Sequence, residues 1–266
     1  MKLLFPLLML MLLVSCKPKS GTDADHPELS AKEVFKKDSF KDNNGNTLLY
    51  NILDPVDIKG GERYPLMVFL HGAGERGDDN EAQLMHIAPI FAKDSIRKVH
   101  PSYVIFPQCP EDDRWGAIEE GEGRWIADAT KEATTPMEGV MALIDQLITD
   151  LPIDTNRIYI SGLSMGGYGT YDILSRRPNT FAAAVSICGG GDINAVSRYA
   201  HVPMKIFHGT KDSVVPVQFS RDMYKALKGA SAANVEYIEY PEGTHNVWDK
   251  AYAEPTILDW IYSQKK

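Results

Sequence analysis

The sequence predicts an α/β fold, in which a mostly parallel, doubly wound sheet carries helices on both faces. Short and continuously apolar segments recur along the chain, as expected for strands that are buried on both faces of a sheet. Between them lie segments with an apolar residue every three or four positions, which is typical of amphipathic helices. This alternation favours a parallel sheet covered by helices.

The expected strands are the continuous apolar run at 64–70 and similar runs at 103–106, 157–160, 181–187, 204–207 and 235–240. The expected helices lie near 81–92 and at 136–150, 217–228 and 255–264. Thr135 and Glu138 around Pro136 predict a capping box at the start of the second helix. Asn80 and Gln83 offer a second box before the first helix. No internal repeat or linker interrupts the pattern, so we expect one domain over residues 33–266 and no large lid domain.

Composition excludes several classes of function. The chain has 266 residues, of which 24% are charged and 44% hydrophobic, as is usual for a globular protein. Its net charge of -8 leaves no basic excess to neutralise phosphates, so nucleic acid is not an expected partner. The three cysteines form no CxxC pair, which excludes zinc-ribbon and thioredoxin motifs.

The N-terminus is expected to be a lipoprotein signal peptide over residues 1–15. The apolar run at 3–14 is too short to span a membrane, and Leu-Val-Ser before Cys16 resembles a bacterial lipobox. Acylation of Cys16 would anchor the protein to the bacterial cell envelope, at the periplasmic face or the cell surface. Residues 16–32 lack apolar periodicity and are expected to form a flexible tether. A plain signal peptide with a chance cysteine is the alternative.

A candidate nucleophile follows the expected strand at 157–160. Gly162-Leu-Ser164-Met-Gly166 has the G-x-S-x-G spacing of a nucleophile elbow, a sharp turn from strand to helix that exposes the serine hydroxyl. The glycines are needed because side chains there would meet the neighbouring strand and helix. The Met165 N–H, at the start of the helix, would point at a developing oxyanion. The alternative is a glycine-rich turn that only caps a helix.

A serine hydroxyl needs a base and an acid to act as a nucleophile. Of the seven histidines, His245 lies in the loop after the last expected strand, where the base of such an enzyme belongs. Asp212 lies in the turn after the preceding strand. The order Ser164, Asp212, His245 therefore predicts a catalytic triad. Asp192, which follows three glycines one strand earlier, is the competing acid.

The loop after the strand at 64–70 is expected to complete an oxyanion hole. His71-Gly-Ala73-Gly has the form of the loop that supplies the second N–H donor, which we assign to Ala73. Its glycines also match the G-x-G-x-x-G dinucleotide pattern, with Asp94 about 20 residues further on. However, the expected helix begins only after residues 78–80, and Glu75 would face a pyrophosphate. Nucleotide binding is therefore not expected.

These motifs carry a resemblance that covers nearly all of the mature chain. Six stretches of the sequence resemble a bacterial α/β-hydrolase group: LHGAGERGDDN, PQCP, DTNRIYISGLSMGGYGTYD, ICGGGD, HGTKDSVVP and EGTHNVW. The group is described as predicted peptidases, or as esterases related to phospholipase/carboxylesterases and polysaccharide-side-chain esterases. The resemblance implies the α/β-hydrolase fold and the same triad. Asn246 departs from the group, where Asp often follows the base, but it lies outside the triad.

The expected activity is hydrolysis of carboxylic esters through an acyl-enzyme. The acidic loop around 111–122 lacks the fixed spacing of calcium ligands, and we expect neither metal nor cofactor. Trp115 and Trp125, on the long excursion 107–135, are candidate contacts for a sugar ring or an aromatic acyl group, unless they only pin the loop. The spacing of Cys109 and Cys188 does not decide whether they form a disulfide.

Three functions remain open from sequence. The first is a carboxylesterase, with acetyl or feruloyl groups on polysaccharides as candidate substrates. The second is a serine peptidase of the same fold. The third is a non-catalytic surface lipoprotein that binds glycans, against which the complete triad argues.

Overall fold

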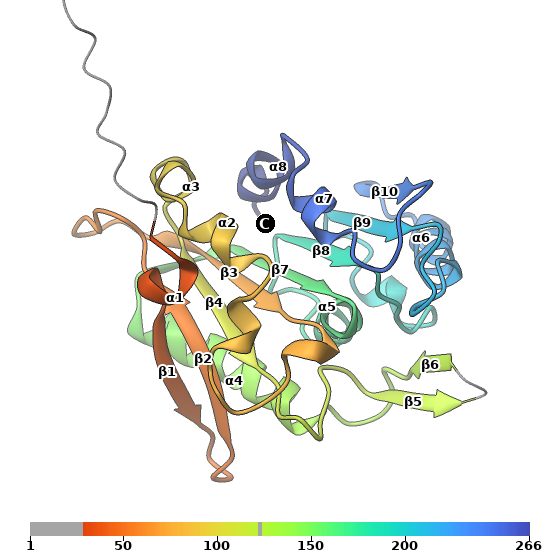
Figure 1. Cartoon of the computed structure of the whole chain (residues 1–266), viewed down its shortest axis with the longest axis horizontal. Helices are drawn as coiled ribbons and strands as arrows, with labels where there is room; N and C mark the ends of the chain where they lie inside the picture. The colour runs from red at the N-terminus through yellow and green to blue at the C-terminus, as the bar shows by residue number, and fades with distance from the viewer. Residues whose placement is uncertain (1–28, 122–123) are drawn as a thin grey trace, which may run out of the picture.

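The six runs expected as strands all lie in one sheet of the computed structural model, which describes residues 29–121 and 124–266. The sheet order is β1-β2-β4-β3-β7-β8-β9-β10 (Figure 1). The strands are β1 Lys36–Lys41, β2 Thr47–Leu53, β3 Tyr64–Leu70, β4 Tyr103–Gln108, β7 Ile153–Leu163, β8 Ala183–Ile187, β9 Met204–Gly209 and β10 Val235–Tyr240. Neighbours from β4 to β10 pair in parallel, which confirms the mostly parallel sheet.

Helices cover both faces of this sheet, as expected. They are α1 Ala31–Val34, α2 Ala88–Ala92, α3 Asp94–Val99, α4 Thr135–Asp150, α5 Met165–Arg176, α6 Gln218–Gly229, α7 Trp248–Tyr252 and α8 Ile257–Ser263. Alternate side chains of β3 show how the sheet divides the interior. Leu66, Val68 and Leu70 pack in the core that α4, α5 and α6 cover, whereas Met67 and Phe69 pack in the core beneath α2, α7 and α8. Of the helices described, none is long and apolar enough to cross a membrane.

Several elements differ from the expectations. The helix expected near 81–92 is instead a short 3-10 turn, Ala82–Leu84, followed by α2. Asn80 does not cap it. Its carboxamide oxygen accepts hydrogen bonds from Asn51 and from Gln83 at 2.9 and 2.6 Å, so the buried side chain ties this segment to β2. The cap of α4 is Thr134 rather than Thr135, because the Thr134 hydroxyl accepts from the Met137 N–H.

Two strand pairs were not expected. β1 and β2 are antiparallel and form one edge of the sheet. β1 escapes the apolar-run criterion because it is largely exposed, whereas β2 is mostly buried and its run is interrupted by Asn51. The excursion 107–135 contains a separate hairpin, β5 Ile118–Gly121 and β6 Arg124–Ala127, which projects from the body of the molecule (Figure 1). At the N-terminal side, α1 begins at Ala31, two residues inside the expected tether, because Ala31 is buried and Ser30 and Glu33 form a capping box.

Candidate active site

The serine elbow forms where β7 meets α5. Ser164 adopts φ 53° and ψ -117°, a conformation that non-glycine residues rarely take. The flanking glycines are required by space: a Cβ on Gly162 would lie 2.1 Å from the Gly166 carbonyl oxygen. A Cβ on Gly166 would lie 1.9 Å from the Leu70 carbonyl oxygen. The turn therefore needs glycine at both positions and holds the serine at the carboxyl edge of the sheet.

The three residues of the expected triad meet in space. The Ser164 hydroxyl lies 2.9 Å from His245 Nε2, and His245 Nδ1 lies 2.7 Å from Asp212 Oδ2. Each residue follows a different strand, β7, β9 or β10, so parallel pairing brings their loops to the same edge. Asp192, the competing acid, instead accepts hydrogen bonds from the Ala129 and Asn194 backbone N–H groups at 3.1 and 2.9 Å.

Asp212 is held by more groups than the sequence suggests. Its Oδ1 accepts the backbone N–H groups of Val214 and Val215, each at 2.8 Å. Its Oδ2 lies 3.1 Å from Nε2 of a second histidine, the fully buried His208. Burial alone would raise the pKa of Asp212, but the hydrogen bonds from His208 and His245 and from the two backbone N–H groups outweigh it and hold the pKa well below its ordinary value. The carboxylate is therefore ionised at neutral pH.

His208 was not singled out from the sequence. Its Nε2 lies 2.9 Å from the Val215 carbonyl oxygen as well as near Asp212, so Nε2 faces two acceptors and must carry the proton. Its Nδ1 lies 2.7 Å from the Ser220 hydroxyl, which links the imidazole to α6. The sequence feature that could have indicated this role is the position of His208 near the end of β9, four residues before Asp212.

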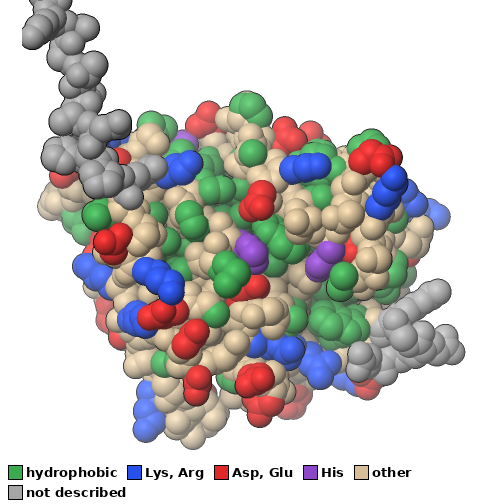
Figure 2. All heavy atoms as spheres, viewed as in Figure 1, with side chains coloured by type: hydrophobic (Ala, Val, Ile, Leu, Met, Phe, Trp, Pro, Cys, Tyr) green, Lys and Arg blue, Asp and Glu red, His purple; other side chains and the backbone are tan. Residues whose placement is uncertain are grey.

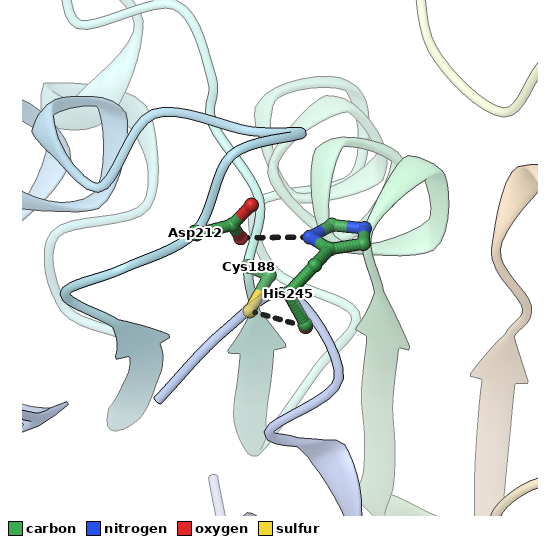
Figure 3. A group of neighbouring side chains, drawn as sticks. All are labelled: Cys188, Asp212 and His245. Carbon is green, nitrogen blue, oxygen red and sulfur yellow. Dashed lines mark hydrogen bonds and ion pairs between the residues drawn. The ribbon is translucent and has the colours of Figure 1, made fainter. Parts of the chain in front are cut away.

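The side chain of Cys188 lies beside Asp212 and His245 (Figure 3). Cys188 Sγ, Asp212 and His245 form a cluster whose ligand atoms lie within 4.8 Å of one another. The Cys188 thiol donates to the His245 carbonyl oxygen at 3.2 Å, and its burial raises the thiol pKa. A cation here would have to replace the Asp212–His245 hydrogen bond, so we read the cluster as support for the base. Cys109 and Cys188 are both buried and free, and they do not form the disulfide left open above.

The two expected oxyanion donors flank the serine. Met165 is the first residue of α5, where backbone N–H groups have no partner within the helix. Ala73 begins a short 3-10 turn, Ala73–Glu75, two residues beyond the end of β3, and it lines the cavity that opens at Ser164. In a dinucleotide-binding loop, a helix would begin at the third glycine, which is Gly77 here. In this loop no α-helix begins at Gly77.

The cavity over Ser164 measures about 490 Å³ and is lined mainly by aromatic and aliphatic side chains. One arm holds Trp125, Tyr168 and Phe219, whose rings form edge-to-face pairs 5.6 and 6.2 Å apart. Figure 2 shows hydrophobic side chains gathered beside two histidines near the centre of this face. The arm suits an apolar or aromatic group of a substrate.

The structure separates the two expected tryptophan contacts. Trp125, on β6, lines the cavity. Trp115 has no exposed surface, and its indole N–H donates to the His71 carbonyl oxygen at 3.1 Å. A side chain without exposed surface cannot touch a substrate, so the expectation for Trp115 is corrected: it packs beneath the loop that carries Ala73.

A second part of the cavity lining contains an ion pair that the sequence did not reveal. Glu75 Oε1 lies 3.2 Å from His86 Nε2, and both side chains line the cavity. Burial alone would raise the pKa of Glu75, but the His86 imidazole outweighs it and lowers that pKa. The Glu75 carboxylate in turn raises the pKa of His86. The two residues are eleven positions apart across an irregular segment, so no periodic pattern links them.

Known esterases are among the proteins that this chain resembles. The chain is 38% identical over 100 residues to a bifunctional acetylxylan esterase/xylanase from Neocallimastix patriciarum. The aligned part is 37% of this chain and 14% of that protein. It is 27% identical over 111 residues to a probable feruloyl esterase C from Aspergillus niger, with 41% of this chain and 40% of that protein covered. The chain thus spans less than half the length of both of these relatives.

Solved structures give the same fold. The crystal structure of a thermostable esterase matches 88% of this chain and 64% of its own, with a TM-score of 0.81 and 37% identity. A ferulic acid esterase from Anaeromyces mucronatus matches 96% of this chain and 98% of its own at a TM-score of 0.64, and its 16% identity shows the fold alone. The expected α/β-hydrolase fold is confirmed.

The family itself is shown by a match over most of the chain. Residues 55–255, which include the serine elbow, the acid and the base, fit the pattern of the phospholipase/carboxylesterase family. The matched span begins just after β2 and ends before α8, so it holds every strand that carries a site residue. The chain therefore belongs to the phospholipase/carboxylesterase family of α/β hydrolases.

Proposed function

We propose that this protein is a serine esterase that hydrolyses carboxylic esters through Ser164, His245 and Asp212. The observation that carries the proposal is the continuous relay of hydrogen bonds, 2.9 Å from Ser164 Oγ to His245 Nε2 and 2.7 Å from His245 Nδ1 to Asp212 Oδ2, at the floor of an open cavity. The family and the esterase names of its relatives support it.

The chemistry follows from the positions of these atoms. Ser164 Oγ attacks the ester carbonyl carbon while its proton passes to His245 Nε2. Asp212 fixes the imidazole with Nδ1 protonated and stabilises the imidazolium that results. The N–H groups of Ala73 and Met165 are the proposed donors to the oxyanion, and one such donor is worth about 10²–10³ in rate. His245 then gives its proton to the leaving alcohol, and water releases the acid from the acyl-enzyme by the same steps.

Acyl groups on polysaccharides, acetyl or feruloyl, are the proposed substrates. Two relatives are named for acetylxylan and feruloyl esters. The aromatic arm of Trp125, Tyr168 and Phe219 offers surfaces for such a group. Peptide hydrolysis is the alternative within the fold, and no contact in the cavity favours it, so a panel of acetate esters, methyl ferulate, acetylated xylan and chromogenic peptides decides between them.

The decisive variant is Ser164→Ala. We expect it to abolish ester hydrolysis with no change in circular dichroism, because only the attacking oxygen is removed. The measurement is turnover of p-nitrophenyl acetate, with release of acid followed in parallel. More than a few per cent of the wild-type rate in the variant would remove Ser164 from the role of nucleophile.

We further propose that Cys16 is lipidated and anchors the enzyme to the bacterial envelope. Cys16 lies outside the described residues, and the proposal rests on the lipobox-like sequence before it. Full-length protein should enter the detergent phase on phase partitioning, and Cys16→Ser should leave it in the aqueous phase. Unaltered protein that stays aqueous would contradict the anchor.

A further inference from the structure

The direction of proton transfer fixes which arm of the cavity receives the alcohol. His245 Nε2 must reach the oxygen of the leaving alcohol, so the alcohol lies on the His245 side of Ser164. On that side the ring of Trp248 packs edge-to-face against His245, with centroids 5.6 Å apart. Trp248 in turn lies against His86, with centroids 5.1 Å apart. All of these side chains line the same cavity.

The alcohol side differs in polarity from the aromatic arm. It ends in the Glu75–His86 pair, whose side chains are 10% and 27% exposed. Gly72 makes room for the carboxylate, since a Cβ there would lie 3.0 Å from Glu75 Oε2 and 2.8 Å from a Leu163 methyl group. A largely buried carboxylate is thus held at the cavity wall although an apolar residue would be less costly to bury.

This combination matches the chemistry of a polyhydroxy alcohol. Carboxylate oxygens accept hydrogen bonds from hydroxyl groups, an imidazole can donate or accept, and an indole presents a broad surface to a sugar ring. An alkyl alcohol would displace water from Glu75 without replacing its hydrogen bonds, which disfavours binding. The pair therefore discriminates between alcohols rather than between acyl groups.

We propose that Glu75, His86 and Trp248 form the alcohol subsite of this esterase and select esters whose alcohol is a sugar or another polyol. The proposal rests on the esterase activity proposed above. It assigns the aromatic arm of Trp125, Tyr168 and Phe219 to the acyl group, and it places specificity for the alcohol on the segment 75–86.

The test compares two esters that share one acyl group. Ethyl acetate and methyl 6-O-acetylglucopyranoside are hydrolysed in a pH-stat by wild type, Glu75→Gln and His86→Phe. We expect wild type to prefer the sugar ester, and each variant to lower the ratio of kcat/KM between sugar and ethyl ester by about tenfold or more, mainly through KM, because a hydrogen bond to a charged group is lost. Phe219→Leu, on the acyl side, is the matched control and should leave the ratio within about twofold.

The outcomes separate the two proposals. If wild type hydrolyses neither ester nor p-nitrophenyl acetate, the proposed esterase function fails. If it hydrolyses them but Glu75→Gln lowers both rates equally, only the subsite is overturned, and Glu75 then serves to position the Ala73 loop. A second measurement does not depend on turnover of a sugar ester: methyl glucoside should inhibit hydrolysis of p-nitrophenyl acetate competitively in wild type and several-fold more weakly in His86→Phe. Equal inhibition in both proteins would also overturn the subsite.

Discussion

At the scale of single residues, the acid of the relay is the clearest point to test. Asp212→Asn should keep the size of the side chain yet lower kcat by as much as ~10⁴, because the amide favours the wrong tautomer of His245. Asp192→Asn should cost far less, since the Asp192 carboxylate accepts hydrogen bonds from the Ala129 and Asn194 backbone N–H groups, which lie outside the relay. Both variants are compared by kcat/KM on one ester near neutral pH, with circular dichroism as the folding control. A larger loss in Asp192→Asn would reassign the acid.

His208 offers a second test at this scale, as a positioning residue. Its Nε2 is 3.1 Å from Asp212 Oδ2, so the imidazole helps to fix the carboxylate that orients His245. We expect His208→Ala to lower kcat by about 10- to 100-fold with little change in KM, the effect of losing one hydrogen bond to a charged group. His208→Gln, whose amide can still donate, should restore part of the rate. An unchanged kcat in a folded His208→Ala protein would show that Asp212 needs no such support.

At the scale of elements, the junction of β7 and α5 depends on the absence of side chains. A Cβ on Gly166 would lie 1.9 Å from the Leu70 carbonyl oxygen, whereas a Cβ on Gly74 would meet nothing within 4 Å. Gly166→Ala should therefore destabilise the fold by more than about 2 kcal/mol, because backbone of β3 would have to shift. Gly74→Ala is the matched control and should unfold at the wild-type temperature. Thermal unfolding of the two variants measures the difference, and equal melting temperatures would refute this account of the elbow.

At the scale of the whole molecule, the Glu75–His86 pair should make stability depend on pH. The pair raises the pKa of His86 above 6.5, so its contribution is present below that value and fades as the pH rises through the raised pKa. The pKa of Glu75 is lowered below 4.5, so the contribution also fades as the pH falls through that lowered value. The full effect therefore lies between about pH 4.5 and 6.5.

The variant His86→Gln tests this dependence because it keeps a hydrogen-bonding group and removes the charge. Its melting temperature should fall below that of wild type by the largest margin within that window. The margin should shrink near pH 9, where His86 is neutral in both the folded and the unfolded protein. A margin that is constant from pH 5 to pH 9 would mean that charge does not contribute.

Much of the architecture could be predicted because its causes are local. Every expected strand is present. The central strands β3, β4 and β8 are buried along their whole length and must be apolar there, whereas β10, at the edge of the sheet, is only partly buried and carries Glu236 and Glu239. The edge strand β1 was missed because its exposed residues carry no apolar run. The prediction of one helix near 81–92 was wrong, because this segment is organised by the buried side-chain hydrogen bonds of Asn80 rather than by helical periodicity.

The sequence by itself determined the family fold and the order of Ser164, Asp212 and His245, because parallel strands place the loops that follow them at one edge whatever the loops contain. Only the tertiary structure decided which side chains share that edge. In the tertiary structure, His208 lies within hydrogen-bond distance of Asp212, and Glu75 pairs with His86. Trp115 is buried in the core, whereas Trp125 lines the cavity. The physical reason is that periodicity and turn chemistry act over a few residues, whereas these contacts depend on how loops of different strands pack against one another.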